Sequence, residues 1–163
     1  MFQAAAISSA DPREFYAELA RQLEGLLAGE RDAIANAANM SALIFTSVPD
    51  LNWAGFYFLK GDMLVLGPFQ GKPACVRIAL GQGVCGAAAQ QRRTQRIDDV
   101  NAFPGHIACD SASRSELVVP LVRGDKVWGV LDLDSPTPGR FSATDQAGLE
   151  RLAVIFLDNS DAP

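Results

Sequence analysis

The residues best suited to chemistry in this sequence are three cysteines, Cys75, Cys85 and Cys109. Cys85 follows Cys75 by ten positions, and Cys109 follows Cys85 by 24 positions. Because there is no C-x-x-C pair, the spacing excludes a thioredoxin-type active site and a zinc ribbon. A thiolate attacks electrophiles and exchanges with disulfides, so the three residues together indicate thiol redox chemistry.

Cys85 and Cys109 lie in sequence segments of different character. Cys85 lies in the small-residue segment 83–89, where it could equally be a small buried hydrophobic residue. Cys109 lies in the polar segment 103–111, where a thiol is expected to be accessible.

The one histidine, His106, lies three positions before Cys109. His106 or Arg114 could lower the pKa of the Cys109 thiol, whereas Asp110 would raise it. His106 could equally hold a backbone carbonyl within a loop. The residue count also allows a zinc site of three cysteines and one histidine, although the spacing matches no known zinc module.

Two aspartates alternate with leucines in segment 130–134. In an extended strand, Asp132 and Asp134 share one face, and the leucines turn to the core. Strands disfavour aspartate and like charges repel, so this pair indicates a bound cation or a proton-dependent reaction. A solvated strand end is the alternative. Glu116 could join the pair across a hairpin.

Trp53 and Tyr57 share one face of the first expected strand, either as core residues or as an aromatic wall for a small apolar group. A thiolate, up to three carboxylates and this wall would suit removal of oxygen from an electrophile. Clustered carboxylates have one pKa raised, so one can donate a proton near neutral pH, and they can also bind an ammonium group.

The composition is that of a folded, acidic protein, with 48% hydrophobic residues, 20% charged residues and a formal net charge of −5. This balance argues against nucleic acid or an anionic membrane as the main partner. No apolar stretch approaches the roughly 20 residues that span a bilayer, and the first residues do not resemble a signal peptide. We therefore expect a cytoplasmic protein without a static disulfide framework.

Apolar spacing predicts a helix from Asp11 to Gly29, a second from about Asp32 to Phe45, and a last helix capped by Ser142. A short helix is expected at 84–91. Residues 98–115 are expected to form a long functional loop. We expect strands at 53–59, 63–66, 76–80, 117–122 and 127–134. The last two should form a hairpin around the turn 123–126. This order predicts one α+β domain over 1–163, with an antiparallel sheet and helices packed mainly on one face.

Five segments carry a resemblance to a known family: GKPAC (71–75), GQGVCG (81–86), FPGHIACD (103–110), SELVVPL (115–121) and GVLDLDSP (129–136). They resemble the free methionine-(R)-sulfoxide reductases, which are single-domain enzymes of the GAF fold. The resemblance runs from about residue 12 to residue 157. It is specific, because GAF domains that bind cyclic nucleotides or chromophores lack this cysteine triplet with these flanks.

The resemblance implies reduction of free L-methionine (R)-S-oxide, with thioredoxin as the final electron donor. Cys109 matches the cysteine that attacks the sulfoxide sulfur and becomes a sulfenic acid. Cys75 matches the cysteine that resolves this acid as a disulfide. Cys85 matches a third cysteine that can pair with Cys75 or replace it.

The same resemblance implies the substrate-binding residues. Glu116, Asp132 and Asp134 match carboxylates that hold the substrate amine and protonate the sulfoxide oxygen. Trp53 and Tyr57 match the aromatic side of the pocket. We expect backbone N–H groups near Cys109 to bind the substrate carboxylate, no metal or organic cofactor to be required, and a homodimer to form.

Two other functions fit parts of the pattern. A non-catalytic GAF module that senses a small ligand or redox state would share the fold and the pocket. Sensor modules usually adjoin an output domain, so the expectation of one domain favours an enzyme. A zinc-stabilised binding protein would carry stoichiometric zinc.

Overall fold

The computed structural model describes residues 5–105 and 110–163, which form a six-stranded sheet and four α-helices. The strands lie in the order β3-β2-β1-β6-β5-β4, and all neighbouring strands are antiparallel. The elements in chain order are α1 (Pro12–Leu27), α2 (Ala33–Ser47), β1 (Trp53–Lys60), β2 (Met63–Gly71), β3 (Arg77–Ala79), α3 (Gly83–Gln91), β4 (Gln95–Ile97), the 3-10 helix η1 (Val100–Ala102), β5 (Ser115–Arg123), β6 (Lys126–Ser135) and α4 (Ala143–Asn159).

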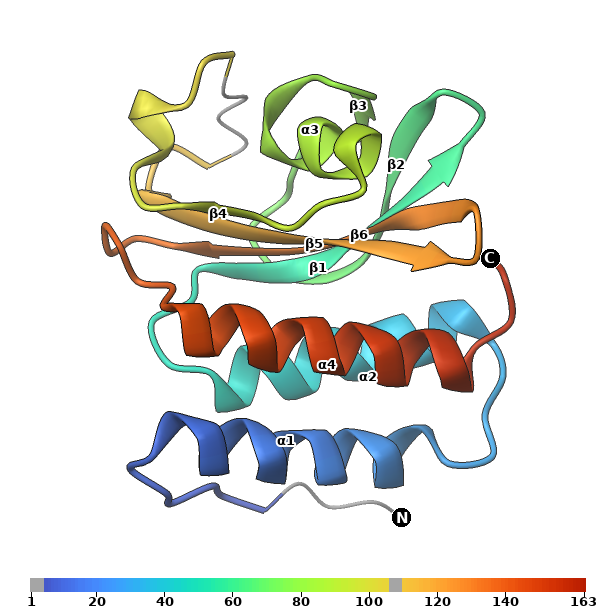
Figure 1. The fold of residues 1–163 in the computed structure, drawn as a ribbon, viewed down its shortest axis with the longest axis vertical. Coiled ribbons are helices and arrows are strands. Elements are labelled where there is room, and N and C mark those ends of the chain that lie inside the picture. The colour runs from blue at the N-terminus through green and yellow to red at the C-terminus, as the bar shows by residue number, and fades with distance from the viewer. Residues whose placement is uncertain (1–4, 106–109) are drawn as a thin grey trace.

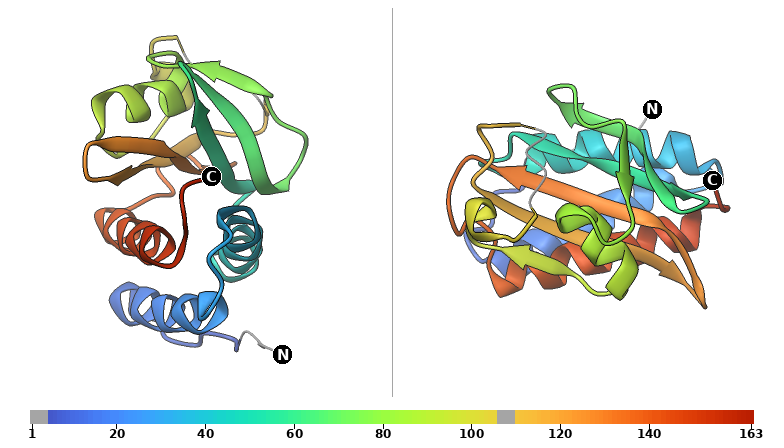
Figure 2. Two further views of the ribbon diagram at one scale, coloured as in Figure 1. Left: turned by 90° about the vertical axis from the view of Figure 1, so that its right-hand side faces the viewer. Right: turned by 90° about the horizontal axis from the view of Figure 1, so that it is seen from above.

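The long helices form two layers on one side of the sheet. α2 and α4 cover one face, and α1 lies beneath them, packed against α4 and α2 (Figure 1). The expectation of helices mainly on one face is therefore confirmed for α1, α2 and α4. The short helix α3 is the exception, because it covers the opposite face (Figure 2).

Alternation along the strands divides the hydrophobic residues between the two faces. Leu117 of β5 and Leu131 and Leu133 of β6 are fully buried in the core between the sheet and the long helices. Val118 and Val130 point the other way and belong to a second hydrophobic cluster beneath α3. The predicted turn of the two leucines toward the core is confirmed, and the alternating aspartates must then face α3.

Side-chain caps define where the long helices begin. A carboxylate oxygen of Asp11 accepts a hydrogen bond from the N–H of Arg13, and Asp32 caps α2 in the same way. Ser142 and Asp145 form a capping box at the start of α4, which confirms that prediction. No helix in the described part of the chain is long and apolar enough to cross a membrane.

The sheet extends further than the sequence pattern predicts. β4 was not expected, because its three residues show no apolar alternation, and it exists through pairing with β5. β2 was expected to end at Leu66 but continues through Pro68 to Gly71, paired with β1. The expected loop 98–115 contains η1 and ends where β5 begins.

The buried Tyr16 side chain joins α1 to α4. Its hydroxyl donates a hydrogen bond to Oδ1 of Asp145 at 2.8 Å. The aromatic ring lies over Gly148 of α4, where an added Cβ atom would lie 2.2 Å from the ring. The two helices can approach this closely because position 148 has no side chain.

Gly148→Ala should therefore destabilise the protein by about 1–3 kcal/mol, because the added methyl group overpacks the contact with Tyr16. Helix propensity alone would give the opposite sign, since alanine is favoured over glycine by about 1 kcal/mol. Urea unfolding followed by circular dichroism measures the difference. In a Tyr16→Ala background the same substitution should be neutral or stabilising, and a penalty that persists there would contradict the packing explanation.

Candidate active site

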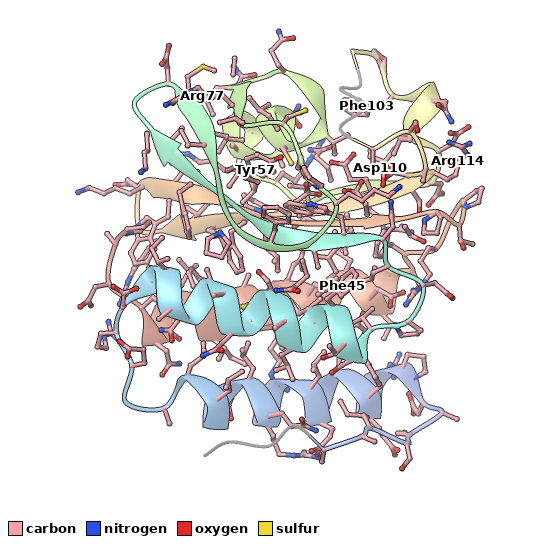
Figure 3. The ribbon with its side chains drawn as sticks, turned by 180° about the vertical axis from the view of Figure 1, so that it is seen from behind. Phe45, Tyr57, Arg77, Phe103, Asp110 and Arg114 are labelled. Atoms are coloured by element: carbon pink, nitrogen blue, oxygen red, sulfur yellow. The ribbon has the colours of Figure 1, made fainter. Side chains whose placement is uncertain are left out.

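A pocket opens on the face of the sheet that α3 covers. About 530 Å³ of space between atoms, open solvent at its mouth included, lies among its lining residues. Figure 3 shows Tyr57 and Asp110 on this side of the sheet and Phe45 on the side of the long helices. The described lining residues are Trp53, Tyr57, Pro73, Ala74, Ile78, Gln82, Gly83, Val84, Cys85, Asp110, Ser113, Glu116, Asp132 and Asp134.

Three carboxylates meet in this pocket because of the strand register. Glu116 of β5 is paired with Asp134 of β6, and Asp132 lies two residues earlier on the same face. Glu116 and Asp132 are each 6% exposed, and Asp134 is partly buried. The prediction that Glu116 joins the two aspartates is confirmed, and the alternative of a solvated strand end is wrong.

Burial raises the pKa of all three carboxyl groups. At Glu116, loss of hydration is the main cause, and the charges of Asp132 and Asp134 add to it. Burial raises the pKa of Asp132 to about 7. At Asp134 the pKa is also raised well above its usual range, mainly by burial. The pocket therefore holds protons near neutral pH unless a cation enters.

The surroundings of the three carboxylates favour the binding of a positively charged ligand. Oδ1 of Asp132 is buried and has no hydrogen-bond partner among the described residues. No lysine or arginine is among the lining residues within 5–105 and 110–163. A ligand with a positive charge would balance the charge of the carboxylates, and its N–H groups would donate hydrogen bonds to the unpartnered oxygen.

Cys85 lies beside these carboxylates, in the first turn of α3. It is a free thiol, 4% exposed, with its Sγ atom 3.9 Å from Oε1 of Glu116. Burial, with the charges of Asp132 and Glu116, raises the pKa of the Cys85 thiol well above its usual range. Cys85 is thus buried, as one interpretation of its sequence setting predicts, and it also lines the pocket, whereas its redox role stays a prediction.

Ligand atoms of Cys85, Glu116 and Asp132 all lie within 4.8 Å of one another. In the described part of the chain, this is the group that could hold a metal ion. The zinc site of three cysteines and one histidine stays a prediction, because Cys109 and His106 lie outside the described residues and Cys75 is disulfide-bonded in this structure. An ammonium group needs only the carboxylate oxygens of this group.

The expected aromatic wall is present in the pocket, on β1, where Trp53 is paired with Asp134 of β6. The rings of Trp53 and Tyr57 are stacked, with centroids 5.9 Å apart and an interplanar angle of 26°. Phe69 of β2, which sequence reasoning missed, stacks on Trp53 at 5.2 Å. Burial, followed by the charge of Asp132, raises the pKa of the Tyr57 hydroxyl, which therefore stays protonated.

The same two aromatic residues hold the loop between β2 and β3. The indole N–H of Trp53 donates a hydrogen bond to the carbonyl oxygen of Lys72 at 3.1 Å. The hydroxyl of Tyr57 donates to the carbonyl oxygen of Cys75 at 3.0 Å. The wall of the pocket thus fixes the loop that carries Cys75.

Cys75 is disulfide-bonded, whereas Cys85 is not part of a disulfide. The predicted nucleophile Cys109 and its neighbour His106 fall in 106–109, outside the described residues. The expected backbone site for the substrate carboxylate, in the loop near Cys109, stays a prediction.

Asp110 connects the end of that segment to the rest of the pocket. Its Oδ2 atom accepts a hydrogen bond from Nδ2 of Asn52 at 3.2 Å and lies 3.5 Å from Nζ of Lys72. Hydrogen bonds, the strongest from the N–H of Ala112, hold the Asp110 pKa below its usual range. Asn52 also donates to Ser113 at 3.0 Å.

Sequence reasoning gave Asn52, Lys72 and Ser113 no role. Lys72 lies in the GKPAC segment, which was a usable signal. Asn52 precedes β1 and Ser113 precedes β5, and neither carried a recognisable pattern.

Known proteins resemble this chain in sequence and in fold. Residues 11–156 match the GAF domain family. The chain is 56% identical over 141 residues to the free methionine-R-sulfoxide reductase of Escherichia coli (strain K12), with 86% of each chain covered. The X-ray structure of the free methionine-R-sulfoxide reductase from Neisseria meningitidis in complex with its substrate superposes with a TM-score of 0.93 at 42% identity, covering 98% of this chain and 95% of that one. A putative GAF sensor protein from Burkholderia vietnamiensis gives a TM-score of 0.90 at 59% identity, covering 93% and 96%.

The raised carboxyl pKa values predict how stability depends on pH. A carboxyl group whose pKa is higher in the folded than in the unfolded state stabilises the fold at low pH, and this contribution is lost as pH rises through the folded pKa. Between about pH 4 and pH 7, the ligand-free protein should lose stability, and Asp132→Asn should reduce that loss by on the order of 4 kcal/mol.

Urea unfolding at several pH values measures this loss. The exposed Asp62→Asn variant is the control, since it removes the same charge outside the pocket. Equal pH dependence in Asp132→Asn and the wild type would show that Asp132 does not carry the effect.

Proposed function

Since the chain belongs to the GAF-domain family and, within it, to the free methionine-R-sulfoxide reductases, we propose that it reduces free L-methionine (R)-S-oxide to L-methionine. The observation that carries the proposal is the buried carboxylate cluster, which lacks a lysine or arginine among the described lining residues. A free amino acid brings an ammonium group to this cluster. A methionine sulfoxide inside a peptide does not.

The pocket suits the two ends of such a substrate. Its ammonium group would donate hydrogen bonds to Glu116, Asp132 and Asp134, including the unpartnered Oδ1 of Asp132. The methyl group would lie against the stacked rings of Trp53 and Tyr57. The substrate carboxylate would bind backbone N–H groups near Cys109.

In the proposed reaction, the thiolate of Cys109 attacks the sulfoxide sulfur. A carboxyl group with a raised pKa protonates the sulfoxide oxygen, and Asp132, with a pKa of about 7, is suited to this at neutral pH. The S–O bond of the substrate breaks, the oxygen passes to the cysteine sulfur, and methionine leaves. Cys109 is then a sulfenic acid, two electrons more oxidised than the thiol.

The thiol of Cys75 then attacks the Cys109 sulfenic acid, which forms a disulfide and releases water. The disulfide at Cys75 in the structure is compatible with this oxidised state. A dithiol protein, for which we propose thioredoxin, restores both thiols by disulfide exchange. The net change is sulfoxide plus two thiols to sulfide, disulfide and water.

The need for reduction in every turnover suits a reducing compartment, so we propose a cytoplasmic enzyme. The family resemblance also supports a homodimer. Sedimentation equilibrium of the purified protein tests this directly, and a monomer at micromolar concentration would contradict it.

Turnover should be specific for the free amino acid and for one epimer. With thioredoxin, thioredoxin reductase and NADPH, the free (R)-sulfoxide should be reduced at a rate at least about 100-fold above the (S) epimer and the N-acetylated (R)-sulfoxide, since each lacks one fitted contact. NADPH absorbance measures the rate. Equal reduction of the acetylated form would contradict recognition of the ammonium group, and binding without turnover would favour the sensor function.

The proposed roles of Cys109 and Cys75 predict different losses of activity when each is replaced by serine. Cys109→Ser should abolish turnover, because the nucleophile is gone. Cys75→Ser should release about one methionine per chain without reductant and then stop, because the sulfenic acid is no longer resolved. Methionine released per chain, measured by chromatography, distinguishes the two. Undiminished thioredoxin-dependent recycling in Cys75→Ser would show that another thiol resolves the acid.

A further inference from the structure

Cys85 is placed as part of the carboxylate site rather than as part of a disulfide. It projects from the first turn of α3 into the pocket, among residues that the sheet supplies. Its Sγ atom lies 3.9 Å from Oε1 of Glu116, and its side chain is buried. The nearest acidic neighbours of this thiol are therefore the groups proposed to hold the substrate ammonium.

The surroundings of Cys85 also keep it protonated. A resolving cysteine works as a thiolate, and thiolates are favoured near positive charge. Cys85 has the opposite environment, since burial and the charges of Asp132 and Glu116 raise its pKa. It stays a free thiol in a structure where Cys75 is disulfide-bonded.

A protonated thiol has a use at this position, because S–H is a hydrogen-bond donor. Its contacts with Glu116 and Asp132 counteract the rise of both carboxyl pKa values, so they favour the charged carboxylates. A charged carboxylate held from one side by a neutral donor can accept a hydrogen bond from an ammonium group on another side.

We propose that Cys85 is a positioning residue of the ammonium site, whose S–H group holds the Glu116 carboxylate, and that it takes no part in disulfide exchange. This inference rests on the proposed function, because it assigns a role within the same substrate site. It separates the three cysteines into a redox pair, Cys75 and Cys109, and a hydrogen-bond donor.

The kinetic test compares Cys85→Ser with Cys85→Ala, which differ only in a hydroxyl donor. The alanine variant should raise KM for the free (R)-sulfoxide by about tenfold, the loss expected for one hydrogen bond to a charged group. The serine variant should recover part of that loss. Both should continue through many turnovers with thioredoxin, whereas the Cys75→Ser control stops after about one.

A spectroscopic test needs no substrate. In the oxidised protein, prepared to one free thiol per chain and kept at an alkaline pH where the Glu116 carboxyl group is ionised, the infrared S–H stretching band reports Cys85. Donation to a carboxylate lowers the frequency of this band, so Glu116→Gln should shift it upward, because an amide oxygen is a weaker acceptor. The exposed Glu24→Gln variant serves as the control and should leave the band in place.

Each alternative gives a distinct result. A Cys85→Ser variant that stops after one turnover would overturn the inference and assign Cys85 to the disulfide relay. The donor role would be overturned if KM were equal in the wild type, the serine variant and the alanine variant. It would also be overturned if Glu116→Gln left the frequency of the S–H band unchanged. Absence of turnover in the wild type would instead contradict the proposed function, and the infrared result would still decide whether Cys85 donates to Glu116.

Discussion

The arrangement of the pocket depends on one electrostatic constraint: two buried carboxyl groups and a third, partly buried one lie together without a lysine or arginine among the described lining residues. Ionising all three without a counter-charge is costly in a medium of low dielectric constant. The empty pocket must therefore keep protons, and one bound ammonium group balances only part of the carboxylate charge, so a proton can remain beside it. Selectivity for a small ammonium ligand and a supply of protons for chemistry both arise from this one constraint.

The sheet is what maintains this repulsive cluster. Glu116 and Asp134 face each other across β5 and β6, and β6 is paired with β1 on its other side. On the reverse face, Leu131 and Leu133 are fully buried against the long helices. Since alternate side chains on one strand serve the core and the pocket, the hydrophobic core fixes the positions of the acids.

Much of this arrangement could be predicted from local patterns. The alternation of leucine and aspartate in 130–134 correctly predicted which residues turn to the core, and Ser142 with Asp145 correctly predicted a helix start. β4 could not be predicted, because its pairing with β5 is a tertiary effect without a local signal. The contact of Asn52 with Asp110 joins residues 58 positions apart, and nothing in the sequence near either residue indicates it.

The edges of the sheet have a consequence for solubility. Both outermost strands, β3 and β4, are only three residues long, and each contains an exposed arginine, Arg77 or Arg96. Unpaired N–H and C=O groups on long edge strands are templates on which further chains can assemble into intermolecular sheets. Short edges that carry charge offer such chains little backbone to pair with. The fold thereby protects itself against edge-to-edge aggregation.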